Sequence, residues 1–186
     1  GQAQLQAFVS AAERGVEVVP VWNKSNREHK TVGTVPTSVR SEADEAVRAL
    51  GWSGVYHVDA DHIEKATVDP FIAGSDFFTI DVADAIGSKA SDEDIDAFVK
   101  KHSSLIGRVE IPGIDHPLEI SDSDVRAIAT KFLKAAQAAG ETYRYIAGKK
   151  GSEHCAFEVS IDETDTPQTP VDMLFILAAL ADEGIP

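Results

Sequence analysis

The chain has 186 residues, of which 43% are hydrophobic and 26% are charged, and these values are typical of a globular protein with a sizeable core. Its net charge of -14 comes from acidic residues spread along the chain, which argues against nucleic acid and anionic membranes as partners. No apolar run reaches the ~18 residues of a transmembrane helix, and the single cysteine, Cys155, suits a reducing compartment, so we predict a cytoplasmic protein that acts on a small molecule.

The first half of the chain is predicted to alternate helices with strands. Apolar residues at helical spacing predict helices at 3–14, 38–50 and 64–73. Runs of β-branched and aromatic residues predict strands at 16–22, 54–60 and 77–82. The polar segment 23–30 is predicted to be a loop.

The second half continues with longer helices. Capping residues at Ser91, Ser121 and Thr169 predict helices at 91–106, from 121 to about 139, and at 171–183. A fourth strand is predicted at 154–161. Residues 108–120 are predicted to be a hairpin or an ordered loop, and 141–153 is ambiguous.

The strands have one apolar face and one face that becomes polar toward the carboxyl end. The polar residues are His57, Asp59 and Asp61, then Thr79 and Asp81, then Glu158 and Ser160. An open sheet covered on both sides by helices would be apolar on both faces, whereas the lumen of a (β/α)8 barrel is polar where its active site lies. The pattern therefore favours an α/β fold that is a partial TIM-like barrel.

About four βα units are visible, but a complete barrel needs ~250 residues. We therefore expect residues 1–186 to form a single domain of roughly half a barrel, as a fragment of a longer protein. The span 84–153 is long for one crossover, and we expect it to hold an inserted helical or hairpin lid.

The stretch YHVDADH, residues 56–62, carries the first candidate site. Asp61 and His62 lie where the second strand gives way to a loop, and both reach one site only if the backbone turns at Asp61. A histidine nitrogen binds Zn²⁺, Mn²⁺ or Ni²⁺, and a carboxylate beside a metal acts as a general base. The alternative is a structural role, such as capping the next helix or binding a lysine.

Glu158 is the second candidate, because a glutamate between Phe157 and Val159 is unfavourable in a strand unless it is paired or functional. Partial burial in a lumen would suit a general acid, and a buried salt bridge is the equally weighted alternative.

Polar residues after the first and third strands are candidate substrate ligands. Asn23, Lys24 and Asn26 follow the first strand, and Lys24 would bind a carboxylate or phosphate. Asp81 ends the third strand, either as a residue that holds a ligand or as a partner of a residue that does. A solvated loop is an equally good explanation of residues 23–26.

Three stretches together resemble the tagaturonate epimerase family: PVWNKSNREH (20–29), YHVDADHI (56–63) and DFFTIDVADAIG (76–87). FEVSIDET (157–164), followed by a Thr-Pro helix start, fits as well. The resemblance implies a barrel-like, metal-dependent enzyme of hexuronate catabolism that interconverts D-tagaturonate and D-fructuronate. Members of this family are much longer than this chain.

By this resemblance Asp61 is the proton acceptor, Glu158 the proton donor and His62 a ligand of a divalent cation, Mn²⁺, Zn²⁺ or Ni²⁺. The other histidine ligands would lie beyond Pro186, so the resemblance implies that the chain alone is inactive. The inverted carbon is not next to the ketone, so enolisation cannot invert it. A retro-aldol cleavage and reclosure can, with a base, an acid and a metal.

Two other hypotheses remain. The chain can belong to a different metal-dependent sugar aldolase or isomerase. It can also be a half-barrel without activity, which would form homo-oligomers through its exposed barrel edges.

Overall fold

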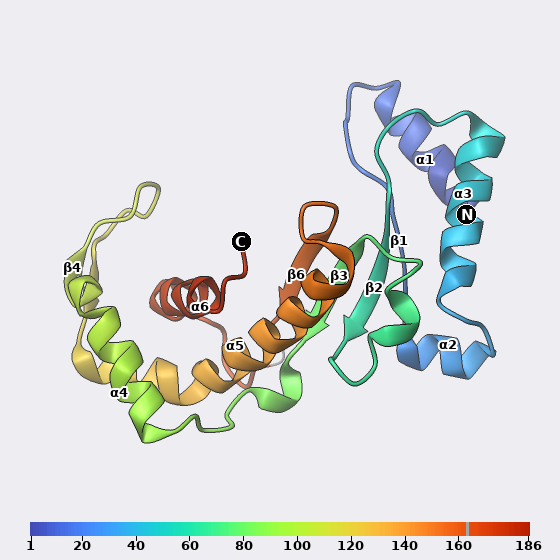
Figure 1. The fold of residues 1–186 in the computed structure, drawn as a ribbon. Coiled ribbons are helices and arrows are strands. Elements are labelled where there is room, and N and C mark those ends of the chain that lie inside the picture. Colours follow the sequence, from blue (N-terminus) through green and yellow to red (C-terminus); the bar gives the residue numbers. More distant parts are fainter. Residues whose placement is uncertain (163) are drawn as a thin grey trace. The chain divides into compact units, whose positions relative to one another are not determined.

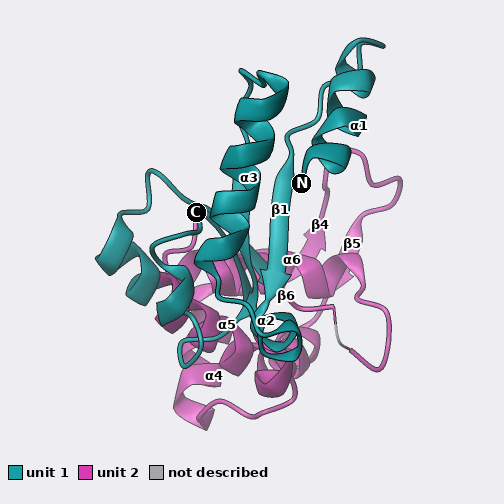
Figure 2. Ribbon diagram, turned by 90° about the vertical axis from the view of Figure 1, so that its right-hand side faces the viewer, with its two compact units in different colours: residues 1–81, 144–159 teal, residues 82–143, 160–186 magenta. Residues whose placement is uncertain are grey.

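The computed structural model describes residues 1–162 and 164–186, so Glu163 of the FEVSIDET stretch lies outside the described residues. The chain divides into two compact units, which Figure 2 colours separately. Unit 1 comprises residues 1–81 and 144–159, and unit 2 comprises residues 82–143 and 160–186. The span 84–153 is therefore shared between the units, and its role as a lid inserted into a single domain stays a prediction.

A four-stranded sheet, of which every residue except Ser160 belongs to unit 1, has the strand order β1-β2-β3-β6 (Figure 1). The strands are β1 (Val21–Ser25), β2 (His57–Ile63), β3 (Phe77–Asp81) and β6 (Ala156–Ser160). β1 pairs with β2, and β2 with β3, in parallel. The predicted α/β class with a parallel sheet is confirmed.

Helices cover the apolar face of this sheet. α1 (Gln2–Ala12) and α3 (Thr37–Leu50) pack on each other, and α2 (Asn26–Val32) lies beside β1. The buried residues that join these helices to the sheet are Leu5, Trp22, Val39, Ala43, Ala46 and Val58. Trp22 of β1 lies in this core.

The predicted strand at 16–22 is wrong in its position. β1 begins only at Val21, and Val16, Val18 and Val19 are about half exposed, at 53%, 49% and 51%. A strand extends only as far as it has a partner, and β2 begins at His57, which pairs with Val21. The apolar run before β1 thus has the composition of a strand without a neighbour to pair with.

The loop predicted at 23–30 is also wrong. Ser25 and Glu28 form a reciprocal capping box that begins α2, with the Glu28 backbone N–H donating to Ser25 Oγ at 3.2 Å. The Ser-x-x-Glu spacing was visible in the sequence. The predicted helix at 64–73 is reduced to the short 3-10 helix η1 (Asp69–Phe71), where Pro70 lacks the N–H that an α-helix through this point would need.

Three helices and a hairpin make up most of unit 2. The helices are α4 (Asp92–Lys101), α5 (Asp122–Lys150, residues 122–143 in this unit) and α6 (Pro170–Asp182). The hairpin pairs β4 (Gly107–Val109) with β5 (Leu118–Ile120) in antiparallel fashion, as one of the two alternatives for this segment predicted. The short 3-10 helices η2 (Ala83–Ala85) and η3 (Ser103–Leu105) complete it.

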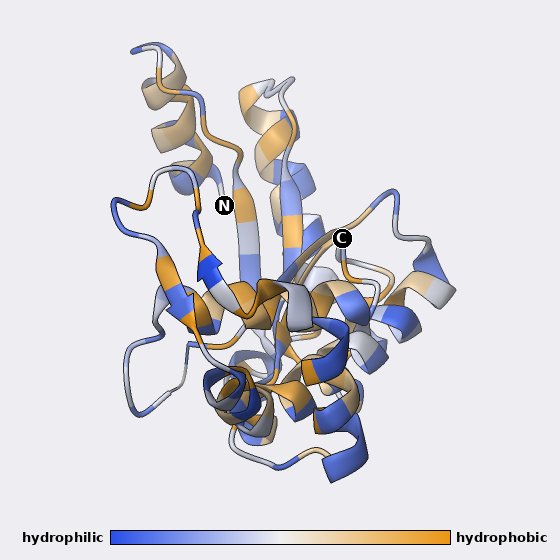
Figure 3. Ribbon diagram, turned by 90° about the vertical axis from the view of Figure 1, so that its left-hand side faces the viewer, coloured by the Kyte–Doolittle hydropathy of each residue, from blue (hydrophilic) through white to orange (hydrophobic). Residues whose placement is uncertain are grey.

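Unit 2 has a core of its own. The rings of Phe98 on α4 and Phe175 on α6 meet edge to face with centroids 6.3 Å apart. At the ends of these helices, Asp182 accepts a hydrogen bond from Lys101 at 2.6 Å and pairs with His102 Nε2 at 2.9 Å. The helices carry both hydrophobic and hydrophilic residues (Figure 3). None of the helices formed by the described residues combines the length and apolar character needed to cross a membrane.

Candidate functional site

The polar face of the sheet in unit 1 brings together side chains from neighbouring strands. In the register of β1 and β2, Asn23 lies opposite Asp59 and Ser25 lies opposite Asp61. Asp59 in turn lies opposite Phe77 of β3. Parallel pairing places the carboxyl ends of these strands at one edge of the sheet, so the polar residues of each strand meet there.

A β-bulge interrupts β2 at Asp61 and His62. Ala60 pairs with Phe78 and Ile63 pairs with Ile80, so two residues of β2 stand against one residue of β3. His62 has φ 50°, and it is the one non-glycine residue in the described part of the chain with positive φ. The sequence hypothesis required a backbone turn at this point, and the bulge supplies one.

The bulge turns two consecutive side chains toward each other. Nδ1 of His62 lies 2.8 Å from Oδ1 of Asp61, with 47% of the His62 side chain and 19% of the Asp61 side chain exposed. If Nδ1 carries the proton, it donates to the carboxylate, and the lone pair of the neutral ring is on Nε2. A histidine oriented by a carboxylate in this way is a common form of metal ligand.

The described residues do not provide a complete metal site. Within residues 1–162 and 164–186, no three His, Cys, Asp or Glu side chains converge closely enough to hold a metal ion. Metal sites in proteins take three or more protein ligands in most cases. The pair at His62 is suited to supply one ligand, and the chain as described does not supply the others.

Asp59 is the site residue that the sequence reasoning missed. Its side chain is only 6% exposed, and it accepts two hydrogen bonds from Thr79. Burial raises the pKa of Asp59 to about 6; the Thr79 hydrogen bonds oppose this shift, and the carboxylates of Asp61 and Glu158 add to it. Its place two residues before Asp61 on the same strand face was the signal available in the sequence.

The ring of Phe157 stacks on that of Phe78 with centroids 5.8 Å apart, so the next residue, Glu158, lies on the other face of the sheet, with Thr79 and Asp59. The Glu158 side chain is nevertheless exposed, and the burial expected of it is not observed. The reason is its position on β6, which ends the strand order and has a neighbour, β3, on one side.

The predicted substrate ligands are dispersed. Asn23 is exposed on the polar face, and Asp81 is half-buried at the end of β3. Asn26 is the first residue of α2. Lys24 lies opposite Ala60, and it lines a hollow of about 250 Å³ with Gln4 of α1 and Glu42 of α3. This hollow is smaller than the ~300–1,000 Å³ of most small-molecule sites.

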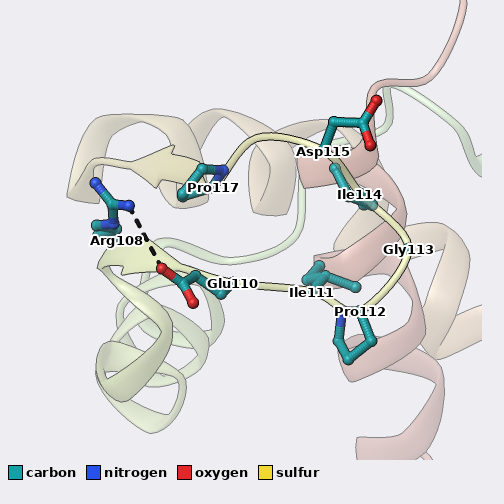
Figure 4. A pocket seen from close by; sticks show the side chains of 8 residues that line it. All are labelled: Arg108, Glu110, Ile111, Pro112, Gly113, Ile114, Asp115 and Pro117. Carbon is teal, nitrogen blue, oxygen red and sulfur yellow. Dashed lines mark hydrogen bonds and ion pairs between the residues drawn. The ribbon is translucent and has the colours of Figure 1, made fainter.

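A second hollow lies in unit 2, within the loop between β4 and β5 (Figure 4). Arg108 and Glu110 form an ion pair at its side, with Nη2 and Oε1 3.4 Å apart. Residues of this one segment, 108–117, form the whole lining, and it includes none of the predicted site residues.

Comparisons with known proteins agree with the resemblance found in the sequence. A family model described as tagaturonate epimerase matches residues 3–186. The tagaturonate/fructuronate epimerase of Thermotoga maritima is 25% identical over 174 residues, which are 87% of this chain and 35% of that protein. The chain thus spans about a third of the length of this relative.

Solved structures of one enzyme have the same fold. They are crystal structures of fructuronate-tagaturonate epimerase from Cohnella laeviribosi. The form complexed with one glycerol has a TM-score of 0.74 at 19% identity, covering 99% of this chain and 40% of that one. The form with two glycerols has a TM-score of 0.67 at 20% identity, covering 96% and 39%.

Proposed function

The chain belongs to the tagaturonate epimerase family, and on that premise we propose that it forms part of the active site of a longer enzyme that interconverts D-tagaturonate and D-fructuronate. The observation that carries the proposal is the bulge at Asp61 and His62, which turns a carboxylate and an imidazole together at the end of a parallel strand. Chemistry in barrel enzymes is concentrated at this end of the strands.

Asp61 is the proposed proton acceptor. In a retro-aldol route it takes the proton from the hydroxyl on the carbon that inverts. That carbon becomes an aldehyde as its bond to the neighbouring carbon breaks, and the electron pair passes to the ketone-bearing fragment as an enediolate. The aldehyde rotates, the bond forms again, and the proton returns. The His62 ring, 2.8 Å from one carboxylate oxygen, would fix the orientation of Asp61.

Glu158 is the proposed proton donor. Its effect on the pKa of Asp59 supports a place on the same face of the sheet as Asp61. We propose that the exposed side chain found here is covered by substrate and by further strands in the longer enzyme. Such cover would favour its protonated form, which is the form that a general acid needs.

His62 is the proposed ligand of a divalent cation, Mn²⁺, Zn²⁺ or Ni²⁺. The pairing of its Nδ1 with Asp61 supports a ligand role for Nε2, but the described residues do not complete the site. We therefore assign this chain one ligand and derive no step that passes through the metal.

The remaining assignments follow from the position of each residue. Asn23, Asn26 and Asp81 are proposed to bind the sugar acid at the edge of the sheet. Lys24 would have to turn away from Glu42 to reach the carboxylate of the substrate. The four-stranded sheet is proposed to be about half of a TIM-like barrel, and the cytoplasmic location stays a prediction from composition.

The exposed edges of this sheet support a second proposal. β1 and β6 are the outer strands, and Val21 on β1 is 42% exposed. Unpaired strand edges with apolar residues favour association. We propose that this chain, when isolated, forms homo-oligomers through them, and size-exclusion chromatography of the 186-residue chain tests this. A stable monomer would contradict it.

The function is tested on the complete protein that contains this chain, with D-tagaturonate followed by proton NMR after Mn²⁺, Zn²⁺ or Ni²⁺ is added. We expect metal-dependent appearance of D-fructuronate, lost in Asp61→Asn. Asp84→Asn, which removes an exposed carboxylate on η2, is the matched control. A folded, metal-loaded protein that leaves D-tagaturonate unchanged would contradict the assignment and favour another sugar aldolase or isomerase.

The retro-aldol route is tested separately, by trapping the three-carbon products of cleavage during the reaction of the complete enzyme. Normal epimerisation without such products would contradict the route.

A further inference from the structure

Asp59 joins β2 to β3 directly beside the bulge. The backbone N–H of Thr79 donates to its Oδ1 at 3.1 Å, and the Thr79 hydroxyl donates to its Oδ2 at 3.0 Å. Both side chains are buried, with 6% of Asp59 and 4% of Thr79 exposed. We call these two hydrogen bonds the Asp59–Thr79 clamp.

The register explains why the clamp is at this point. Thr79 is the residue of β3 that stands alone against Asp61 and His62. A bulge disrupts the backbone ladder and leaves a position without its regular partner. A buried backbone N–H is costly when it is unpaired, and here the carboxylate of Asp59 accepts the hydrogen bond.

The bulge is also a conformation that needs support. The positive φ of His62 costs about 1 kcal/mol in a residue that has a Cβ, so regular pairing would be preferred unless neighbouring contacts held the bulge. The clamp provides such contacts, because it ties Asp59, which pairs with Phe77 before the bulge, to Thr79, the residue of β3 opposite the bulge.

We infer that Asp59 is a positioning residue: through its two hydrogen bonds to Thr79 it holds the bulge that orients Asp61 and His62 for the reaction. The inference rests on the proposed function of the pair at Asp61 and His62. The buried carboxylate is not placed to touch substrate, and it acts through the backbone that connects it to Asp61.

The alternative is that Asp59 acts by its negative charge. The two possibilities can be separated, because the N–H and the hydroxyl of Thr79 can form hydrogen bonds with a neutral amide as well as with a carboxylate. In Asp59→Asn the amide oxygen accepts from the Thr79 N–H, and the amide nitrogen donates to the Thr79 hydroxyl. Asp59→Asn thus keeps the clamp without the charge, and Asp59→Ala removes both.

The experiment measures kcat and KM of the complete, metal-loaded enzyme on D-tagaturonate with paired variants. Asp59→Ala is expected to lower kcat by about 100-fold and Thr79→Val by about 10-fold, with KM nearly unchanged, since contacts that orient a metal ligand or base affect the rate by such factors. Asp59→Asn and Thr79→Ser, which keep the hydrogen bonds, are expected to stay close to the wild type.

Hydrogen exchange of the peptide 57–63 gives a second readout, and faster exchange is expected in Asp59→Ala and Thr79→Val alone. If Asp59→Ala does not fold, the comparison of Thr79→Val with Thr79→Ser still tests whether the hydrogen bonds of the clamp affect kcat. Equal loss in Asp59→Asn and Asp59→Ala, or wild-type kcat in Thr79→Val, would overturn the inference. These results can be told apart from a failure of the proposed function. If the wild-type enzyme has no epimerase activity, the proposed function is wrong. If the wild type is active and Asp61→Asn is inactive, either of the two results above refutes the inference alone.

Discussion

At each end of β2 a histidine of the strand lies beside an aspartate, but the surroundings of the two pairs differ. At the start of the strand, His57 Nδ1 lies 3.6 Å from Asp76 Oδ1. The same oxygen accepts the Val58 backbone N–H at 2.8 Å and pairs with Arg40 Nη2 at 3.0 Å. At the other end, His62 Nδ1 lies 2.8 Å from Asp61 Oδ1, in a bulge that also has the carboxylates of Asp59 and Glu158 nearby.

We propose that this difference separates a structural pair, at the start of β2, from a catalytic pair at its end. The Arg40 guanidinium and the Val58 backbone N–H both bind the carboxylate of Asp76, so this carboxylate stabilises the sheet. At the bulge, negative charges accumulate on a half-buried surface and the backbone is strained. Such features cluster at functional sites rather than in cores. Four predictions test this contrast.

The largest effect is expected for the base. Asp61→Asn in the complete enzyme should lower kcat about 1,000-fold, or about 4 kcal/mol of transition-state stabilisation, because an amide cannot accept the substrate proton. The same change at the other end, Asp76→Asn, should leave kcat of the folded enzyme unchanged. Steady-state kinetics followed by NMR measures both. Equal losses would show that the two ends do not differ in function.

The next effect concerns pH. Asp59 has a pKa of about 6 in the folded protein against 3.8 ordinarily, so its contribution to stability is present below 3.8 and is lost as the pH rises through 6. The amide that replaces the carboxylate in the Asp59→Asn variant does not ionise, so this variant does not lose that stability as the pH rises. Its free energy of unfolding relative to wild type should therefore rise by about 3 kcal/mol from acid to neutral pH. The charges of Asp61 and Glu158 face Asp59 and share in the shift. Urea titrations measure it, with Asp84→Asn as control; a difference that does not change with pH would contradict it.

A smaller effect is expected at the structural end. Asp76→Asn weakens a charge-assisted hydrogen bond and leaves Arg40 without its 3.0 Å partner. The free energy of unfolding should fall by about 2 kcal/mol. Asp61→Asn, which changes the pair at the bulge, should lower the free energy of unfolding by a smaller amount. Urea unfolding gives both values, and a reversed order would mean that the bulge, not the start of β2, is the structural pair.

The smallest effect concerns strain. His62→Gly relieves a positive φ and should raise the free energy of unfolding by about 0.5–1 kcal/mol while abolishing activity. His57→Gly is the matched control in the same strand at a residue without positive φ, and it should lower stability. Thermal unfolding compares them. Two losses of equal size would indicate that the bulge is not strained.

Local rules in the sequence predicted much of the fold. Ser91 accepts a hydrogen bond from the Asp94 backbone N–H at 3.0 Å, and Thr169 caps α6 with Pro170 at its start, as their residue types indicated. The predicted helix at 38–50 and strand at 77–82 differ from α3 and β3 by one residue. Capping and helical periodicity involve neighbours within four residues, which a sequence displays directly.

The sequence by itself determined the polar face on which the candidate site lies, because side chains alternate along any strand. The tertiary structure decided where β1 begins, that β2 bulges at Asp61 and His62, that Asp59 is clamped by Thr79, and that Glu158 is exposed. Each of these depends on which strand lies alongside at a given residue. In this sheet such pairing joins residues 17 or more positions apart in the chain, and no local pattern specifies its register.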